Sequence, residues 1–398
     1  MTAILNLPDQ GVDARQAAGP RGAPRAGRRR RGLGAAALIC AALAACGQSR
    51  APQAGPIAQT PAGGGGAGAA QPSVALDEPA RVALLTPLGA SDPGAQAAAR
   101  AIADGARLAA AERPGLITLD ERDTFGRPDA AGAAVREASA AGASVVLGPL
   151  FGANAASVRE AAKAAGLSAI SFSNTPSAAG DGVWLAGLLA GSQADALLRH
   201  ASRRAPGALG LYYPDTAPGQ VARDALLAAA PGAGLSIQPI TAYPRSFEGI
   251  ETSSLGYAQA HAASGAGAVA LPDRGQGLQA AASFLAFHGV GAPRTLLLGF
   301  ADGAGPEALT ENSLRGARFA VPDPRRMADF AARFQARFGR APGDLAWIGY
   351  DAASAAAQMV SRARASGDAT PFGPEDIADP DGFEGVAGRL RFTPDGLN

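Results

Sequence analysis

The feature that most constrains the fold is a regular alternation of strand-like and helix-like segments from Arg81 almost to the C-terminus. Because the strand-like runs are apolar on both faces, they indicate parallel sheets covered by helices on each side. The sequence therefore predicts an α/β fold with two doubly wound sheets of about five or six strands each. The expected strands are Val82–Leu85, Ile117–Asp120, Val145–Leu147, Ala169–Phe172, Leu209–Tyr213, Ser236–Ile240, Ala268–Leu271, Thr295–Leu298 and Ala317–Ala320.

Helical periodicity fills the stretches between these strands. The expected helices are Ala95–Glu112, Pro128–Ala141, Ala153–Ala165, Gln193–Arg204, Gly219–Ala229, Gly275–His288, Pro324–Phe338 and Leu345–Ala365.

The N-terminal region has the pattern of an export leader. Arg28–Arg31 is a basic segment, Gly32–Leu43 is a short apolar run, and Leu43–Cys46 looks like a bacterial lipobox. The apolar run is shorter than the roughly 20 residues of a membrane-spanning helix. An ordinary buried helix is the alternative. We expect residues 1–45 to be a lipoprotein signal peptide with an N-terminal extension, and Cys46 to be lipidated.

A low-complexity segment follows the lipobox. Residues 46–79 consist largely of Gly, Ala, Pro, Gln and Ser, including Gly63–Gly66. Such a composition cannot bury enough apolar surface to fold, and a flexible chain of this length spans roughly 30 Å. We expect a flexible, lipidated tether that holds the folded part in the periplasm. By its resemblance to lipoproteins of Gram-negative bacteria, Gly47 after the cysteine implies sorting to the outer membrane.

Composition excludes several functional classes. The 35 basic and 34 acidic side chains nearly balance, which argues against a nucleic-acid-binding face. Both cysteines, Cys40 and Cys46, precede the folded region, and the three histidines are scattered. Neither a Gly-x-Ser-x-Gly elbow nor a His-Glu-x-x-His zinc motif occurs. We therefore expect no enzymatic activity, no metal and no cofactor.

Candidate binding residues follow the third and fourth predicted strands, because ligands of open parallel sheets lie beyond the carboxyl ends of the strands. One loop holds Pro149, Leu150, Phe151 and Gly152 at the start of a helix, where free backbone N–H groups favour an anion. The other holds Ser173, Asn174 and Thr175. Ordinary turn and capping roles are the alternative for these residues.

The second half of the chain offers further candidates after its strands. Tyr212, Tyr213 and Asp215 follow one strand, and Asp273 and Arg274 follow another. A tyrosine there could present an apolar face and a hydroxyl to a ligand. Burial of the neighbouring Tyr212 in the core and pairing of Arg274 with Asp273 in solvent are equally compatible with the pattern.

These segments resemble the type I periplasmic binding proteins of the leucine-binding group. The resemblance runs from about residue 80 to the C-terminus and is carried by the segments Gly105–Ala109, Asp123–Pro128, Gly148–Pro149, Ser171–Thr175, Asp351–Ala365, Gly382–Phe383 and Arg389–Gly396. It implies two lobes joined by three crossings around a ligand cleft. We place the first lobe at 80–192 and 322–370, and the second at 193–321 and 371–398. The final segment looks like a closing hairpin, with Leu390–Thr393 as a weakly paired edge.

The resemblance also assigns roles and shows departures. Ser173 and Thr175 match the family's carboxylate loop, but Gly152 replaces its hydroxyl residue. The family's aromatic wall falls at Ala217–Pro218, where no ring is present. Its acidic residue for an amino group falls near Ala301 or Asp302, so that Asp302 alone could fill this role.

Two functions remain open. The lipobox, the tether and the Ser171–Asn174 loop resemble lipoproteins described as penicillin-binding protein activators, which implies a peptidoglycan synthase as partner. The alternative is the substrate-binding component of an ABC importer for amino acids or related solutes, with a permease and a small molecule as partners. Binding of a small solute would favour import.

Overall fold

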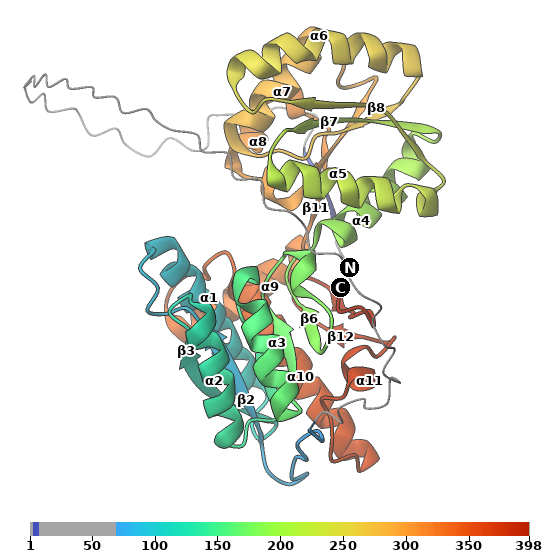
Figure 1. Cartoon of the computed structure of the whole chain (residues 1–398). Helices are drawn as coiled ribbons and strands as arrows, with labels where there is room; N and C mark the ends of the chain where they lie inside the picture. The colour runs from blue at the N-terminus through green and yellow to red at the C-terminus, as the bar shows by residue number, and fades with distance from the viewer. Residues whose placement is uncertain (1–2, 8–68, 398) are drawn as a thin grey trace, which may run out of the picture. The chain divides into compact units, whose positions relative to one another are not determined.

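The computed structural model describes residues 3–7 and 69–397 (Figure 1). Cys46, the apolar part of the leader and most of the predicted tether lie outside the described residues. The strands are β1 (Ala3–Asn6), β2 (Ala80–Thr86), β3 (Ile117–Asp123), β4 (Val145–Leu147), β5 (Ser168–Ser171), β6 (Val183–Leu185), β7 (Ala208–Pro214), β8 (Ser236–Tyr243), β9 (Ala268–Ala270), β10 (Leu296–Phe300), β11 (Arg318–Val321), β12 (Phe383–Glu384) and β13 (Arg389–Leu390). The helices are α1 (Pro93–Glu112), α2 (Pro128–Ala140), α3 (Ala155–Ala165), α4 (Ala190–Arg204), α5 (Ala217–Ala229), α6 (Phe247–Ser264), α7 (Gly275–Phe287), α8 (Pro306–Thr310), α9 (Pro324–Phe338), α10 (Ala346–Ser366) and α11 (Pro374–Ile377).

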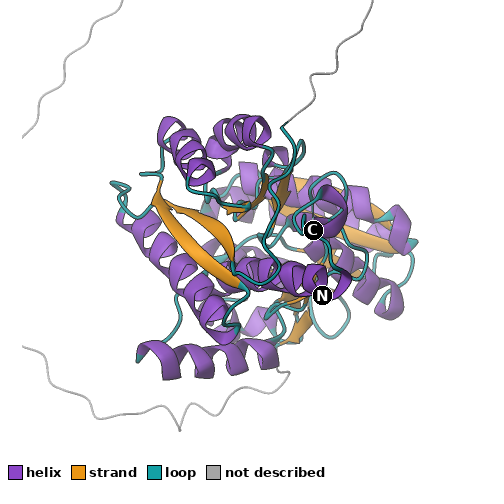
Figure 2. Cartoon of the chain, turned by 90° about the horizontal axis from the view of Figure 1, so that it is seen from below, coloured by secondary structure: helices purple, strands orange, loops and turns teal. Residues whose placement is uncertain are grey.

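The strands form two large sheets with helices between successive strands (Figure 2). The first lobe has the order β3-β2-β4-β5-β6, and all its pairings are parallel. The second lobe has the order β1-β11-β10-β9-β7-β8, in which every pairing except that of β1 is parallel. Apart from β1, both lobes show the same doubly wound order, second-first-third-fourth-fifth. The predicted fold class is confirmed.

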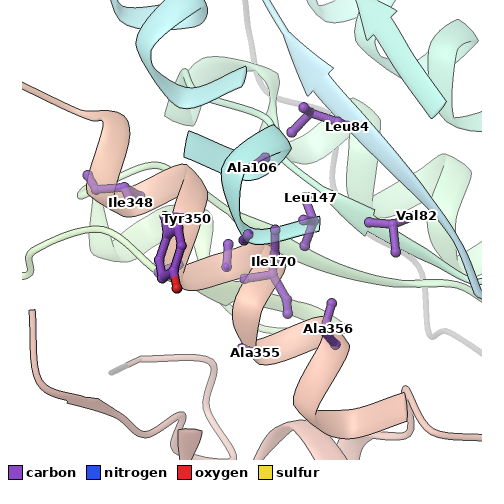
Figure 3. Close-up of a cluster of buried hydrophobic side chains, with 14 of the residues drawn as sticks. Val82, Leu84, Ala106, Leu147, Ile170, Ile348, Tyr350, Ala355 and Ala356 are labelled. Carbon is purple, nitrogen blue, oxygen red and sulfur yellow. The ribbon is translucent and has the colours of Figure 1, made fainter. Parts of the chain in front are cut away.

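The core of the first lobe lies on both faces of its sheet. Alternate residues of β2 point to opposite faces, as the period of a strand requires. Val82 and Leu84 pack with α1 and α10 (Figure 3), whereas Ala83 and Leu85 pack with α2 and α3. Helices α1 and α10 approach closely because Gly349 has no side chain. A Cβ there would lie 2.0 Å from the carbonyl oxygen of Ile102.

The second lobe is built in the same way. Helices α6 and α7 cover the face that carries Val269 and Phe319, and α4 and α5 cover the face that carries Leu209 and Ala320. Tyr212, predicted as either core or cleft, is fully buried, and its ring centroid lies 4.5 Å from that of Tyr243. The alternative that Tyr212 belongs to the core is therefore confirmed.

The strand β1 is absent from the sequence-based prediction. Ala3–Asn6 pairs antiparallel with β11, so residues of the expected N-terminal extension belong to the sheet of the second lobe. The prediction treated this region only as part of a leader. Four residues with a single short apolar run give no periodicity from which a strand could be recognised.

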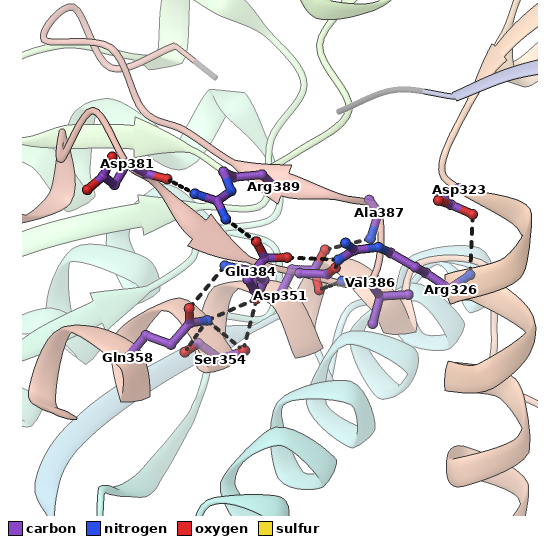
Figure 4. A network of polar contacts seen from close by, with 11 residues as sticks. Asp323, Arg326, Asp351, Ser354, Gln358, Asp381, Glu384, Val386, Ala387 and Arg389 are labelled. Carbon is purple, nitrogen blue, oxygen red and sulfur yellow. Dashed lines mark hydrogen bonds and ion pairs between the residues drawn. The ribbon is translucent and has the colours of Figure 1, made fainter. Parts of the chain in front are cut away.

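The C-terminal segment was assigned to the wrong lobe. Residues 371–398 were expected in the second lobe, but Phe372, Phe383 and Phe392 lie in the core of the first. The buried carboxylate of Asp351 on α10 accepts hydrogen bonds from the backbone N–H groups of Val386 and Ala387, at 2.6 and 3.1 Å (Figure 4). The third crossing expected near residue 370 is therefore absent from the described chain. Leu390 pairs only with β12, as expected for a weakly paired edge.

Candidate functional site

The strand order locates the candidate site in each lobe. In a doubly wound sheet, the loops after the first and third strands diverge to opposite faces and leave a crevice at the carboxyl edge. In the first lobe these are the loops after β2 and β4. A Cβ on Gly126, after β3, would lie 3.1 Å from the ring of Phe151 and 3.7 Å from Ala90. The loops after β2, β3 and β4 therefore meet at one edge.

The two predicted carboxylate loops lie side by side. A Cβ on Gly152 would be 3.1 Å from Ser173 Oγ and 3.1 Å from Thr175 Cβ. Ser173 is buried and its Oγ accepts a hydrogen bond from the Thr175 backbone N–H at 3.1 Å, whereas Asn174 and Thr175 are exposed. Glycine at position 152 thus lets this turn pack close to the Thr175 side chain, at the start of a helical segment.

The chain near Gly152 is held by its neighbours. Pro149 is buried, and its carbonyl accepts hydrogen bonds from the Ser171 hydroxyl at 2.8 Å and from the Phe172 N–H at 3.0 Å. Leu150 and Phe151 are half-buried. Of the predicted residues on this side, the side chains of Asn174, Thr175, Leu150 and Phe151 are at least partly accessible, while Pro149 and Ser173 are buried and support the loops.

Phe125 is an aromatic residue that the sequence analysis missed. Its ring is half exposed and lies over the loop after β2, where a Cβ on Gly89 would come within 2.7 Å of it. Its φ of +50° is unusual for a bulky side chain, and such strain often marks a functional position. The sequence does not show that Phe125 has a positive φ, so no signal in the sequence singles out this residue.

Two buried polar side chains at the same edge were also missed. Thr86 ends β2 and Asn154 follows the Gly152 turn, and both are 1% exposed. The Thr86 hydroxyl and both side-chain polar atoms of Asn154 have no hydrogen-bond partner among the residues that the structure describes. Buried polar groups are normally satisfied, so these atoms are candidates for contact with a bound molecule or water.

In the second lobe, Asp302 is an accessible acid. It lies directly after β10, and the residue as a whole is exposed to solvent. Crowding by surrounding protein atoms raises the pKa of its carboxyl, an effect that the nearby positive charge of Arg274 opposes. An exposed carboxylate in this position can receive an ammonium group.

Asp273 has a different role from the one expected. It is 4% exposed, and its carboxylate accepts hydrogen bonds from the Tyr243 hydroxyl at 2.8 Å, Arg245 Nε at 2.8 Å and the Arg274 N–H at 2.7 Å. These contacts tie the ends of β8 and β9 together. The alternative, a solvent-exposed pair of Asp273 with Arg274, is also wrong, because the carboxylate is buried and binds the side chain of Arg245.

The remaining candidates of the second lobe lie at the end of β7 and directly after it. Tyr213 is buried, and its hydroxyl accepts a hydrogen bond from Arg223 at 3.3 Å. Asp215 is exposed and accepts a hydrogen bond from Gln220 at 3.0 Å. Ala217 and Pro218 are exposed at the start of α5. Asp215 and Asp302 are therefore the accessible ones among the predicted residues of this lobe, and no ring is present at the expected aromatic position, Ala217–Pro218.

A separate cavity of 1020 Å³ includes Thr175 as its one predicted residue. Its walls come from the connection Ala186–Leu189, from α5, from α10 at Trp347 and from the C-terminal segment. The described residues contain no cluster of three or more His, Cys, Asp or Glu that could hold a metal ion. No helix within the described ranges is long and apolar enough to cross a membrane.

Comparison with known proteins identifies the family. The family model described as "Periplasmic binding protein" matches residues 79–395. The chain belongs to the periplasmic binding protein family. Its members are binding proteins rather than enzymes, and their family name implies a location outside the cytoplasmic membrane. No curated protein matches the sequence significantly.

Solved structures of similar fold agree with this assignment. A putative branched-chain amino acid ABC transporter protein from Rhodospirillum rubrum has a TM-score of 0.65 at 16% identity, covering 80% of this chain and 94% of that one. A branched-chain amino acid transporter protein from Rhodopseudomonas palustris has a TM-score of 0.62 at 16% identity, covering 80% and 89%. An ABC transporter substrate-binding protein from Desulfitobacterium hafniense has a TM-score of 0.59 at 20% identity, covering 80% and 94%. The predicted resemblance to leucine-binding-type proteins is confirmed at the level of the fold.

Proposed function

We propose that this protein is the substrate-binding component of an ABC importer, anchored through Cys46, which captures a small solute bearing a carboxylate or amide and an amino group. The pairing of the Gly152 turn with Thr175 carries this proposal, because it sets an exposed hydroxyl beside the first backbone N–H groups of a helical segment. Such an arrangement suits a carboxylate or amide oxygen. Asp302 would receive the amino group.

The apolar part of the solute would lie against aromatic residues of the first lobe. Phe125 and Phe151 stand at the edge where the loops after β2, β3 and β4 meet. They supply the apolar surface that the second lobe lacks at Ala217 and Pro218. A solute with an apolar side chain therefore fits this edge better than a strongly polar one.

A thermal-shift screen of amino acids and small amides tests the proposal. A ligand present at 100 times its Kd stabilises the folded state by about 2.7 kcal/mol. For any ligand found, Thr175→Val and Asp302→Asn should each weaken binding at least tenfold in calorimetry. Glu160→Gln, an exposed change on α3, is the control and should leave affinity unchanged. A broad panel without any shift would contradict the transport proposal.

The raised pKa of Asp302 predicts a specific pH dependence of binding. An ammonium ligand needs the ionised carboxylate, so affinity should fall on acidification at a higher pH than an ordinary aspartate would give. Asp302→Asn should bind weakly with no such decline. A wild-type affinity that stays constant down to the ordinary pKa of aspartate would show that Asp302 does not contact the ligand.

The anchor is tested separately from the solute. Metabolic labelling with a tritiated fatty acid should label the wild-type protein and Cys40→Ser, but not Cys46→Ser. Fractionation of the labelled cells distinguishes the outer from the inner membrane. Unchanged labelling of Cys46→Ser would refute the anchor while leaving the solute proposal intact.

A second candidate function is that of a penicillin-binding protein activator, which contacts a peptidoglycan synthase. An exposed aromatic groove of 650 Å³ between α6 and α7 favours it, since aromatic residues are enriched at protein interfaces. Phe247 and Phe287 are 68% and 83% exposed, and the ring of Phe247 lies 5.1 Å from that of Phe284. Phe287→Ala should then reduce synthase binding, whereas Leu255→Ala, an exposed residue of α6 that does not line the groove, should not.

A further inference from the structure

The outer edge of β11 is occupied by a segment that lies before the predicted lipidation site. In the antiparallel register, Ala3, Ile4 and Leu5 stand opposite Val321, Ala320 and Phe319. The Leu7 N–H donates to the Ala317 carbonyl at 3.1 Å, and the Gly316 N–H donates to the Leu7 carbonyl at 3.3 Å. The segment Ala3–Leu7 thus contains the sixth strand, β1, of the sheet of the second lobe and extends its hydrogen bonding by one residue.

The side chains of this segment enter both layers of the lobe. Leu5 and Leu7 pack into the layer formed with α6 and α7, and Leu7 is only 2% exposed. Ile4 packs into the opposite layer, which α4 and α5 cover. Phe319 and Ala320 on β11 are 1% and 0% exposed beneath the segment. The edge therefore recognises an extended strand with apolar side chains on both faces.

Processing at Cys46 would separate this segment from the folded protein. We propose that the vacated edge of β11 is then a docking site for an extended apolar strand of a partner protein, which takes the antiparallel position of Ala3–Leu7. This inference rests on the proposed lipoprotein processing. An open edge strand presents unpaired N–H and C=O groups and is a ready template for strand addition. The hydrogen bonds to Leu7 and the packing of Ile4, Leu5 and Leu7 define the partner's chemistry: backbone pairing for affinity, and apolar side chains on both faces for specificity.

The test uses the full chain with a specific protease site inserted between residues 12 and 45. After cleavage and dialysis, a fluorescent peptide of residues 2–8 is titrated and its anisotropy recorded. We expect saturable binding that is at least tenfold weaker for the matched peptide carrying Leu5→Asp and Leu7→Asp. The uncut protein should bind neither peptide, because Ala3–Leu7 fills the site.

Hydrogen exchange locates the bound peptide. Binding should slow exchange of the β11 amides and leave β8, the opposite edge of the same sheet, unchanged. Equal binding of both peptides, no binding, or self-association of the cut chain that excludes the peptide would each overturn the proposal. The cut protein needs no lipidation. Absence of peptide binding to the cut protein therefore contradicts strand addition, whereas unchanged fatty-acid labelling of Cys46→Ser contradicts the lipid anchor.

Discussion

Single residues at the carboxyl edge of the first sheet show where backbone strain and candidate function coincide. Phe125 holds a positive φ, half of its ring is exposed, and it lies over Gly89. A positive φ is unfavourable for a bulky residue, and a half-exposed ring returns little burial energy to offset that cost. The strain is consistent with a ring held in position for a ligand.

Replacing Phe125 with asparagine separates strain from binding. Asparagine tolerates a left-handed conformation, so Phe125→Asn should leave the free energy of unfolding unchanged or raise it by up to about 1 kcal/mol. Loss of the ring should weaken binding of an apolar solute roughly tenfold, equivalent to about 1.4 kcal/mol. Denaturant unfolding and calorimetry on the same preparation measure both effects. Unchanged affinity would show that the ring is outside the ligand site.

Asp351 makes a pH-dependent contribution to stability. Its carboxyl is almost completely buried, and desolvation raises its pKa to about 6 although two backbone N–H groups bind it. The protonated form is therefore favoured in the folded state. The stability that this group contributes is complete below its unfolded pKa of about 3.9 and is lost as the pH rises through about 6.

The substitution Asp351→Asn should reveal this contribution. An asparagine amide has a single acceptor oxygen and cannot accept both N–H bonds in the same way, so the variant should be less stable than wild type at pH 4. Between pH 4 and pH 7 the wild type should lose up to roughly 3 kcal/mol relative to the variant. Urea unfolding at both values measures the difference, in which contributions of other groups cancel. A difference independent of pH would contradict the raised pKa.

At the scale of elements, segments with a strong local pattern could be predicted from the sequence, and segments with a weak or short pattern could not. The apolar runs of β4 and β7 and the periodicity of α9 were recognisable because each repeats a local pattern. Helix α6 and strand β6 were missed. Helix α6 has a weakly amphipathic sequence with an interior glycine, and β6 has only three residues.

The candidate site was predictable in part for the same reason. Loops that follow a recognised strand can be placed, and Gly152 and Thr175 do lie together. Thr86 and Phe125 could not be selected, because their importance depends on burial and on a backbone angle that neighbouring elements impose. Long-range contacts, such as that of Asp351 with Val386, decide to which lobe residues 371–398 belong. No local sequence pattern encodes such contacts.

Two helical glycines should respond in opposite ways to the same substitution. Gly349 faces the backbone of α1, so Gly349→Ala should destabilise the protein by at least about 2 kcal/mol. Gly256 lies exposed within α6, where a Cβ would meet nothing within 4 Å. Gly256→Ala should stabilise by up to about 1 kcal/mol, because alanine is the better helix former. Denaturant unfolding measures both, and a stabilising Gly349→Ala would disprove the close approach of α1 and α10.

At the scale of the whole molecule, the described chain passes between the lobes twice, through Ala186–Leu189 and near Pro322. Any hinge motion on ligand binding has to be taken up at such connections. Both border the cavity that is also lined by Trp347 on α10 and by Val221 on α5. A movement of one lobe against the other would therefore change the surroundings of Trp347.

The two tryptophans of the chain allow this motion to be followed. Trp184 lies in β6 within the core of the first lobe and is 4% exposed, away from the connections that would move. With a solute that binds, Trp184→Phe should retain the ligand-induced change in intrinsic fluorescence, because Trp347 remains. Trp347→Phe should lose that change while calorimetry still shows binding. If the signal instead followed Trp184, binding would alter the core of the first lobe rather than the connections between the lobes.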